Sequence, residues 1–251
     1  MTHLRLSRPA EGVAVVELDD PDRANALSVD LSADLAQTMA TLGDDADVRA
    51  VVITGRGRAF CAGADLSQLG ESREEGLRVI YEGFLAVAES PLVTVAAVNG
   101  AAVGAGANLA LACDVRVAGP GARFDCRFLQ LGIHPGGGHT WMLRRLVGPQ
   151  TATAMLLVGE VLDANAAVAH GLAWEATGDD SLLERSIELA SRAGSVPRNL
   201  LLTTKATLSE VAGIESHREA VELELGRQVA SMDTDEFAER LSRMKARINA
   251  D

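Results

Sequence analysis

The stretch that most constrains the fold covers residues 90–113, which carry no charged side chain. It is long enough to cross a bilayer as one helix. However, it contains Asn99, Asn108 and glycines at positions 100, 104 and 106, and much of the remainder is alanine. Glycine interrupts regular structure, and small residues let backbones pack closely. We therefore expect a buried strand, a glycine-rich turn and a buried helix inside a globular protein.

Short apolar runs alternate with helical patterns through the first 120 residues. Such runs occur at residues 13–18 (VAVVEL), 50–54 (AVVIT), 92–98 and 115–118, and Ser28 is placed to cap a helix between the first two. Continuous apolar strands separated by helices are typical of a parallel sheet that is covered on both faces. The sequence thus predicts an α/β fold with a largely parallel sheet.

Helical patterns dominate after residue 140. The expected helices are at residues 140–147, 150–158, 163–169, 180–193, 198–211, 214–230 and 233–247. Asp163 is a predicted N-cap, and Asp233 with Glu236 has the spacing of a capping box. We expect a core domain over residues 1–195 and a helical region over residues 196–251.

Charge and cysteine content exclude several functional classes. The formal net charge is −12, which disfavours general nucleic-acid binding, and no basic amphipathic segment suits a membrane surface. The three cysteines are an odd number, widely spaced, with no pair at zinc-site spacing. Buried, reduced thiols in a cytoplasmic protein are therefore expected, with no metal and no membrane or nucleic-acid partner.

Three glycine-rich segments carry the functional signal. They are GRAFCAGADL at residues 57–66, NGAAVGAGANLALACD at residues 99–114 and LGIHPGGG at residues 131–138. Small residues let a ligand approach the backbone, and the first N–H groups of a following helix are free donors. Two such groups aimed at one point form an oxyanion hole. Taken singly, each segment is better explained by close packing of a helix on a sheet.

Together with Asn25-Ala26-Leu27 after an arginine, these segments stand in an order that resembles the crotonase (enoyl-CoA hydratase/isomerase) family from about residue 4 to 247. The resemblance implies a spiral of ββα units followed by a helical C-terminal region that mediates trimerisation. The expected assembly is a homotrimer or a dimer of trimers. The ligand would be an acyl-CoA or enoyl-CoA of fatty-acid or related metabolism. No separate cofactor is implied, because coenzyme A is part of the substrate.

The resemblance assigns roles to individual positions. The backbone N–H groups of Ala64 and Ala105 match the two donors of the family's oxyanion hole. The matching substrate-binding positions are Arg23, Ala24, Ala26, Ala62, Asp65, Leu66, Gly104, Pro135 and Gly136. Arg23 is placed to meet a phosphate of coenzyme A, although an ordinary surface arginine is an equally good interpretation.

Two positions depart from the family pattern. Asn108 and Phe128 stand where the hydratases carry their two catalytic glutamates. Neither side chain is an acid or base near neutral pH, so the usual two-glutamate hydration is not expected. His134 is the best remaining acid/base candidate, because histidine titrates near neutral pH. His139 is interpreted as structural or on the surface, and Asp125 as a surface residue.

Two functional hypotheses stay open. The first is an enzyme, a lyase or isomerase that acts through the oxyanion hole. The second is a non-catalytic protein that binds or carries acyl-CoA, which the loss of both glutamates favours. A Rossmann-type nucleotide site is a distant third, because its glycine-rich turn should follow the first strand, whereas Gly12 precedes the run at residues 13–18.

Overall fold

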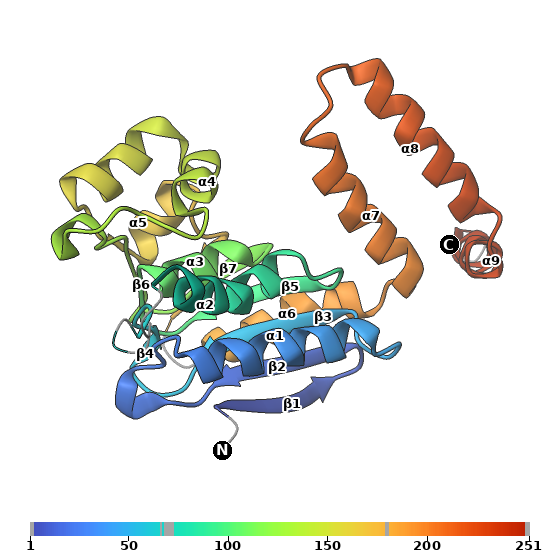
Figure 1. The fold of residues 1–251 in the computed structure, drawn as a ribbon. Helices are drawn as coiled ribbons and strands as arrows, with labels where there is room; N and C mark the ends of the chain where they lie inside the picture. The colour runs from blue at the N-terminus through green and yellow to red at the C-terminus, as the bar shows by residue number, and fades with distance from the viewer. Residues whose placement is uncertain (1–2, 66, 68–72, 179–180, 249–251) are drawn as a thin grey trace. The chain divides into compact units, whose positions relative to one another are not determined.

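The computed structural model describes residues 3–65, 67, 73–178 and 181–248. The chain forms two compact units, Met1–Ser195 and Val196–Asp251. Figure 1 shows the helices and strands of both.

The first unit is built on a six-stranded sheet. In spatial order its strands are β1 (Leu4–Ala10), β2 (Val13–Leu18), β3 (Ala50–Gly55), β5 (Val93–Val98), β7 (Val115–Ala118) and β10 (Glu175–Ala176). β1 pairs antiparallel with β2, and the remaining pairs are parallel. The four apolar runs recognised in the sequence are thus confirmed as β2, β3, β5 and β7. β1 was not predicted.

A second sheet of four short strands lies beside the first. Its order is β4 (Ala59–Cys61), β6 (Ala101–Val103), β8 (Arg123–Asp125) and β9 (Leu162–Asp163). The chain passes from the large sheet to the small one three times, from β3 to β4, β5 to β6 and β7 to β8. Helices α2 (Arg73–Ala88) and α3 (Ala105–Ala112) follow the first two passages. This alternation is the expected spiral of ββα units.

Helices cover both faces of the large sheet. Alternate residues of β2, β3, β5 and β7 form an apolar cluster with Leu182 and Ala190 of α6 (Leu182–Gly194). The intervening strand residues face the other side, where α1 (Val29–Asp44) and α2 lie (Figure 1). Ser28 caps α1 as predicted, since its hydroxyl accepts the Leu31 N–H at 3.0 Å. The core between α6 and the sheet is therefore made of small and branched aliphatic side chains.

A helical segment connects β8 and β9 of the second sheet. α4 (His139–Thr153) bends at Gly148, whose φ is 74°, and continues into a short π-helical segment, Ala154–Val158. Gly148 has a non-helical backbone (φ 74°, ψ 173°) that divides α4 into two helices, so the separate helices expected at residues 140–147 and 150–158 are confirmed, although the second ends as a π-helix. α5 (Ala164–Ala169) is capped by Asp163 as predicted, because this side chain accepts the Ala166 N–H at 2.9 Å.

The second unit contains α7 (Arg198–Val211), α8 (His217–Met232) and α9 (Asp235–Ile248). The capping-box prediction is wrong in detail: Thr234 accepts the Phe237 N–H at 3.3 Å, because α9 begins after Thr234 and not after Asp233. Neither α7 nor α8 buries any residue. Trimerisation through this region stays a prediction. Over the residues that the structure describes, no helix is both long and apolar enough to span a membrane.

Candidate active site

Ala105 occupies the first position of α3, at the carboxyl end of β6. Gly104 precedes the helix with φ 52° and ψ −113°, a conformation that glycine adopts readily, and its N–H donates to the Asp125 carbonyl at 2.9 Å. The first N–H groups of a helix have no acceptor within the helix. Among the described residues none accepts from the Ala105 N–H, so this donor is available to a ligand.

Ala64 lies in a single parallel bridge to Leu27. The Leu27 N–H donates to the Gly63 carbonyl at 2.7 Å, and the Asp65 N–H donates to the Leu27 carbonyl at 2.9 Å. In a parallel bridge of this kind, Leu27 is hydrogen-bonded to Gly63 and Asp65, the residues on either side of Ala64. The N–H of Ala64 itself therefore points away from Leu27. Ala64 therefore presents a second backbone donor.

Two close backbone contacts bring the segments of these donors together. A Cβ added to Gly106 would lie 2.0 Å from the Cys61 carbonyl oxygen, and one added to Gly63 would lie 3.0 Å from the Val103 carbonyl oxygen. The loop before Ala64 thus packs on the chain both before and after Ala105. The geometry suits an oxyanion hole, although that role remains predicted for both residues.

The predicted coenzyme A positions lie on two loops that are joined by hydrogen bonds. The Ala62 N–H donates to the Ala24 carbonyl at 3.0 Å. Asn25, which is fully buried, donates from Nδ2 to the carbonyls of Arg56 and Ala59, each at 2.9 Å. Asn25 also accepts the Asp20 N–H. Sequence reasoning missed this anchoring role, and the only signal for it is a polar residue inside the Asn25-Ala26-Leu27 motif.

Arg23 lies beside these loops and is about half exposed. Its Nε donates to Asp20 at 2.7 Å, and its Nη1 lies 3.8 Å from a carboxylate oxygen of Asp65. The hydrogen bond to Asp20 raises the pKa of Arg23 above its ordinary value, so the guanidinium stays charged. Both carboxylates compete with a phosphate for this cation. Leu66, the remaining predicted contact here, is outside the described residues.

Asn108 and Phe128 stand at the two positions where the sequence comparison predicts that the catalytic glutamates are replaced, which stays a prediction. Asn108 is 1 % exposed, and its Nδ2 donates to the Gly136 carbonyl at 2.9 Å. The Phe128 ring is close to Gly104 and contacts the His139 ring edge-on, with 4.9 Å between ring centroids. Both positions are therefore filled by side chains that lack acid or base character.

The glycines of the third segment let its backbone approach α2 and α3. A Cβ on Gly137 would lie 2.4 Å from the Phe84 ring and 2.8 Å from Nδ2 of Asn108, and one on Gly136 would lie 2.2 Å from the Tyr81 hydroxyl. Gly136 is a predicted substrate contact, and its carbonyl accepts a hydrogen bond from Nδ2 of Asn108. Contact of Pro135 or Gly136 with a ligand stays a prediction.

The two histidines of this region differ sharply. His134 is exposed, and its Nδ1 lies 2.7 Å from the Pro135 carbonyl oxygen, so Nδ1 carries a proton there. His139 is 1 % exposed, with Nδ1 at 2.5 Å from Oδ1 of Asn108 and Nε2 at 3.1 Å from Sγ of Cys126. Burial lowers the pKa of His139 to about 4. The histidine in contact with Asn108 is therefore His139, and the acid/base role of His134 stays a prediction.

Asp125 is a correction to the sequence interpretation. Its side chain is buried rather than on the surface, and it pairs with Arg127 at 2.5 Å. Its backbone carbonyl holds Gly104, so the residue supports the start of α3. The predicted buried thiols are confirmed, because all three cysteines are free and buried.

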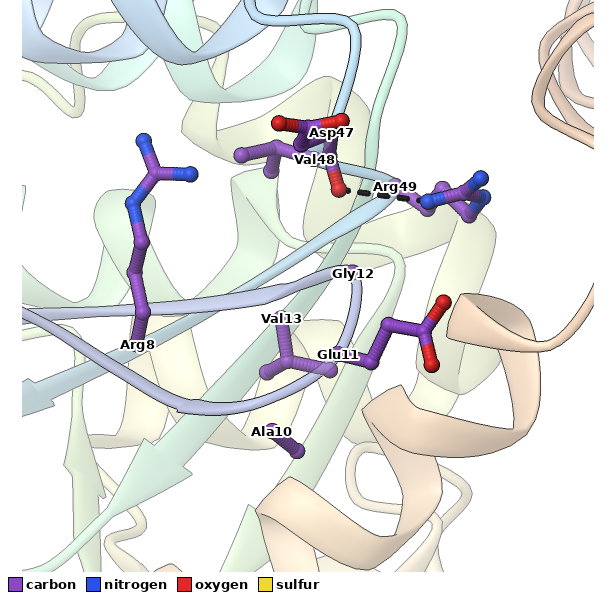
Figure 2. Close-up of a pocket in the computed structure, with 8 residues that line it drawn as sticks. All are labelled: Arg8, Ala10, Glu11, Gly12, Val13, Asp47, Val48 and Arg49. Carbon is purple, nitrogen blue, oxygen red and sulfur yellow. Dashed lines mark hydrogen bonds between the residues drawn. The ribbon is translucent and has the colours of Figure 1, made fainter.

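A separate pocket of about 330 Å³ opens where β2 and β3 begin, whereas the donors of Ala64 and Ala105 follow the carboxyl ends of strands. Figure 2 shows Arg8 and Arg49 on opposite sides of this pocket. Arg8 is paired with Asp45 at 2.5 Å, and Nη1 of Arg49 donates to the Asp47 carbonyl at 3.2 Å. The two cations do not converge on one point, and the glycine-rich site remains the better candidate.

Comparison with known proteins gives a consistent family. The family model described as enoyl-CoA hydratase/isomerase matches residues 8–248. A probable enoyl-CoA hydratase of Mycobacterium tuberculosis is 51% identical over 92% of this chain and 93% of its own length. The 1,2-epoxyphenylacetyl-CoA isomerase of Escherichia coli is 34% identical over 78% of each chain. A crystal structure of an enoyl-CoA hydratase from Bacillus anthracis superposes with a TM-score of 0.93 at 28% identity, covering 98% of this chain and 97% of the other.

Replacing Gly106 by alanine should damage the site and the fold together. The new methyl would meet the Cys61 carbonyl at 2.0 Å, and neither backbone is free to move away. We expect a loss of about 1–3 kcal/mol in the free energy of unfolding, typical of an overpacked core, and weaker binding of acyl-CoA. Gly43→Ala in α1 is the control, because its Cβ would make an ordinary 3.7 Å contact. Equal stability of Gly106→Ala and wild type in urea would contradict this packing.

The need to keep buried His139 neutral should lower the free energy of unfolding in mild acid. The folded-state pKa is about 4 and the ordinary value is 6.5, so between these pH values the unfolded chain binds a proton that the folded chain does not. The free energy of unfolding therefore falls as pH drops from 6.5 to 4, by about 3 kcal/mol from this group alone. Urea titrations across that range should show a shallower slope for His139→Gln than for wild type. Parallel slopes would mean that the imidazole is not buried in the neutral form.

Proposed function

Because this chain belongs to the enoyl-CoA hydratase/isomerase family, we propose that it binds an acyl-CoA thioester and stabilises the enolate of that thioester through the backbone N–H groups of Ala64 and Ala105. The observation that carries the proposal is the pair of close contacts, Gly106 to Cys61 and Gly63 to Val103, that hold the segments of these two donors against each other. Donors fixed before reaction need no reorganisation when charge develops on the thioester oxygen.

The magnitudes favour enolate chemistry over ordinary hydration. One oxyanion donor contributes about 10²–10³ in rate, and one positioned acid or base contributes roughly 10²–10⁴. With Asn108 and Phe128 at the expected glutamate positions, the protein keeps the first contribution and lacks the second from those two positions. We therefore propose a lyase or isomerase of acyl-CoA metabolism that is a poor hydratase by the two-glutamate route.

The alternative is a non-catalytic acyl-CoA carrier. The carrier hypothesis also rests on the expected loss of the two carboxylates. The relatives described above do not support it, because they are named as hydratases and an isomerase. A panel of acyl-CoA and enoyl-CoA thioesters, with mass spectrometry of the products, separates the two directly. Conversion of any thioester supports the enzyme, and binding without conversion supports the carrier.

Assembly and location complete the proposal. We expect a homotrimer or a dimer of trimers, because α7 and α8 bury no residue and carry exposed apolar side chains such as Leu208, Leu225 and Val229. Three free, buried thiols suit a reducing cytoplasm. No cofactor beyond the coenzyme A of the substrate is proposed.

Ala105→Pro should remove the preference for a thioester over free coenzyme A. Proline is tolerated at the first position of a helix but has no N–H to donate. Wild type should bind butyryl-CoA several-fold more tightly than coenzyme A by calorimetry, and the variant should bind both equally. Ala105→Gly keeps the N–H and is the matched control. If the folded proline variant retains the wild-type preference, Ala105 is not a donor to the thioester.

His134→Gln tests the proposed acid/base. Its Nδ1 faces the Pro135 carbonyl, which leaves Nε2 as the basic nitrogen. On whichever thioester is converted, the rate should fall by about 10²-fold or more if His134 moves a proton. His170→Gln is the control, since His170 is an exposed histidine of the same unit. A loss below about tenfold would remove His134 from the mechanism.

A further inference from the structure

A buried chain of polar groups runs from Cys126 through His139 to Asn108. Sγ of Cys126 lies 3.1 Å from Nε2 of His139, Nδ1 of His139 lies 2.5 Å from Oδ1 of Asn108, and Nδ2 of Asn108 lies 2.9 Å from the Gly136 carbonyl oxygen. The three side chains are each 2 % exposed or less. The oxyanion hole alone does not need this chain.

The Gly136 carbonyl fixes the direction of every bond in the chain. A carbonyl only accepts, so the amide nitrogen of Asn108 must face it and Oδ1 must face His139. Nδ1 of His139 must then carry the proton. The ring is neutral near pH 7, because burial lowers its pKa to about 4. Its Nε2 is therefore an acceptor, and the thiol of Cys126 donates to it.

The order Cys–His–Asn also occurs where a thiol is a nucleophile. That role requires a thiolate or an easily formed one. Here burial raises the pKa of Cys126 to about 12, and the neighbouring imidazole is a weak base. Both groups stay neutral, so the chain is a set of fixed dipoles that orients Asn108.

Asn108 is well placed relative to the oxyanion hole. It follows Ala105 by three residues, so both lie on one face of α3, about 4.5 Å apart along the helix axis. Its Nδ2 uses one hydrogen on Gly136, and no acceptor for the second is found among the described residues. A buried donor without a partner is unfavourable, which makes this N–H a natural partner for a ligand atom.

We propose that Cys126 and His139 are positioning residues that hold the Asn108 amide as a hydrogen-bond donor to an oxygen on C3 of the acyl chain. This inference rests on the proposed function, because the thioester carbonyl must occupy the hole formed by Ala64 and Ala105. An atom two carbons beyond that carbonyl then lies near the next turn of α3. The preferred ligands are acyl-CoA thioesters with a 3-hydroxyl or 3-oxo group.

Butyryl-CoA and 3-hydroxybutyryl-CoA provide the test, because they differ by one hydroxyl group. We expect wild type to bind one enantiomer of the hydroxylated thioester about tenfold more tightly, as measured by calorimetry under conditions in which mass spectrometry finds the ligand intact. Asn108→Leu should abolish that ratio. Cys126→Ala should reduce it at least threefold, and Cys126→Ser, which restores a donor to His139, should recover it.

The outcomes separate the two proposals. Failure of both thioesters to exceed free coenzyme A would overturn the proposed function. Equal binding of the two thioesters, each above coenzyme A, would overturn only the role of Asn108. An unchanged ratio in Cys126→Ala would remove the positioning role, and an acyl adduct on Cys126 would show a nucleophile instead. If that variant does not fold, nitrogen NMR of wild-type His139 decides, since an Nε2–H tautomer contradicts the chain.

Discussion

The site depends on one close contact, between the first turn of α3 and the carbonyl of Cys61. Gly106 has no side chain, and even a methyl group there would lie 2.0 Å from that carbonyl. Because the contact is between backbones, it fixes the start of α3 relative to the loop that carries Ala64 without using any side-chain rotamer. An oxyanion hole needs this kind of rigidity, since its donors act only when they are already in place.

The surroundings of Asn108, one of the two predicted glutamate positions, are also fixed by a close approach of backbone. Asn108 faces the Gly136 carbonyl at 2.9 Å. A carboxylate oxygen at that distance would repel the Gly136 carbonyl oxygen. The carboxylate would therefore have to be protonated, or the loop that carries Gly136 would have to move away. His139 adds a donor aimed at Oδ1. The groups around position 108 are thus complementary to an amide side chain.

The sequence predicted the parts of the fold that have a local signal. β2, β3, β5 and β7 lie inside the sheet and read as apolar runs. β1 was missed, because it is an exposed edge strand whose Arg5 and Arg8 pair with Asp19 and Asp45. β4, β6 and β8 are three residues long each, too short for a periodic pattern. The backbone donors were predictable for the opposite reason, since glycine and alanine at a strand-to-helix junction are visible in the chain itself.

The polar chain could not be read from the sequence, because its members come from three distant segments. Cys126 follows β8, His139 begins α4 and Asn108 lies in α3, so only tertiary packing joins them. Motif position made His134 the better acid/base candidate but could not tell whether His139 was buried or on the surface. The structure shows that His134 faces solvent and that His139 is buried, with a pKa of about 4. A buried neutral histidine between a thiol and an amide cannot supply a proton readily, but it holds its partners in one orientation. In the proposed mechanism, charge stabilisation falls to the backbone and orientation to the buried side chains, which leaves proton transfer to a group at the exposed edge of the site or to the substrate itself.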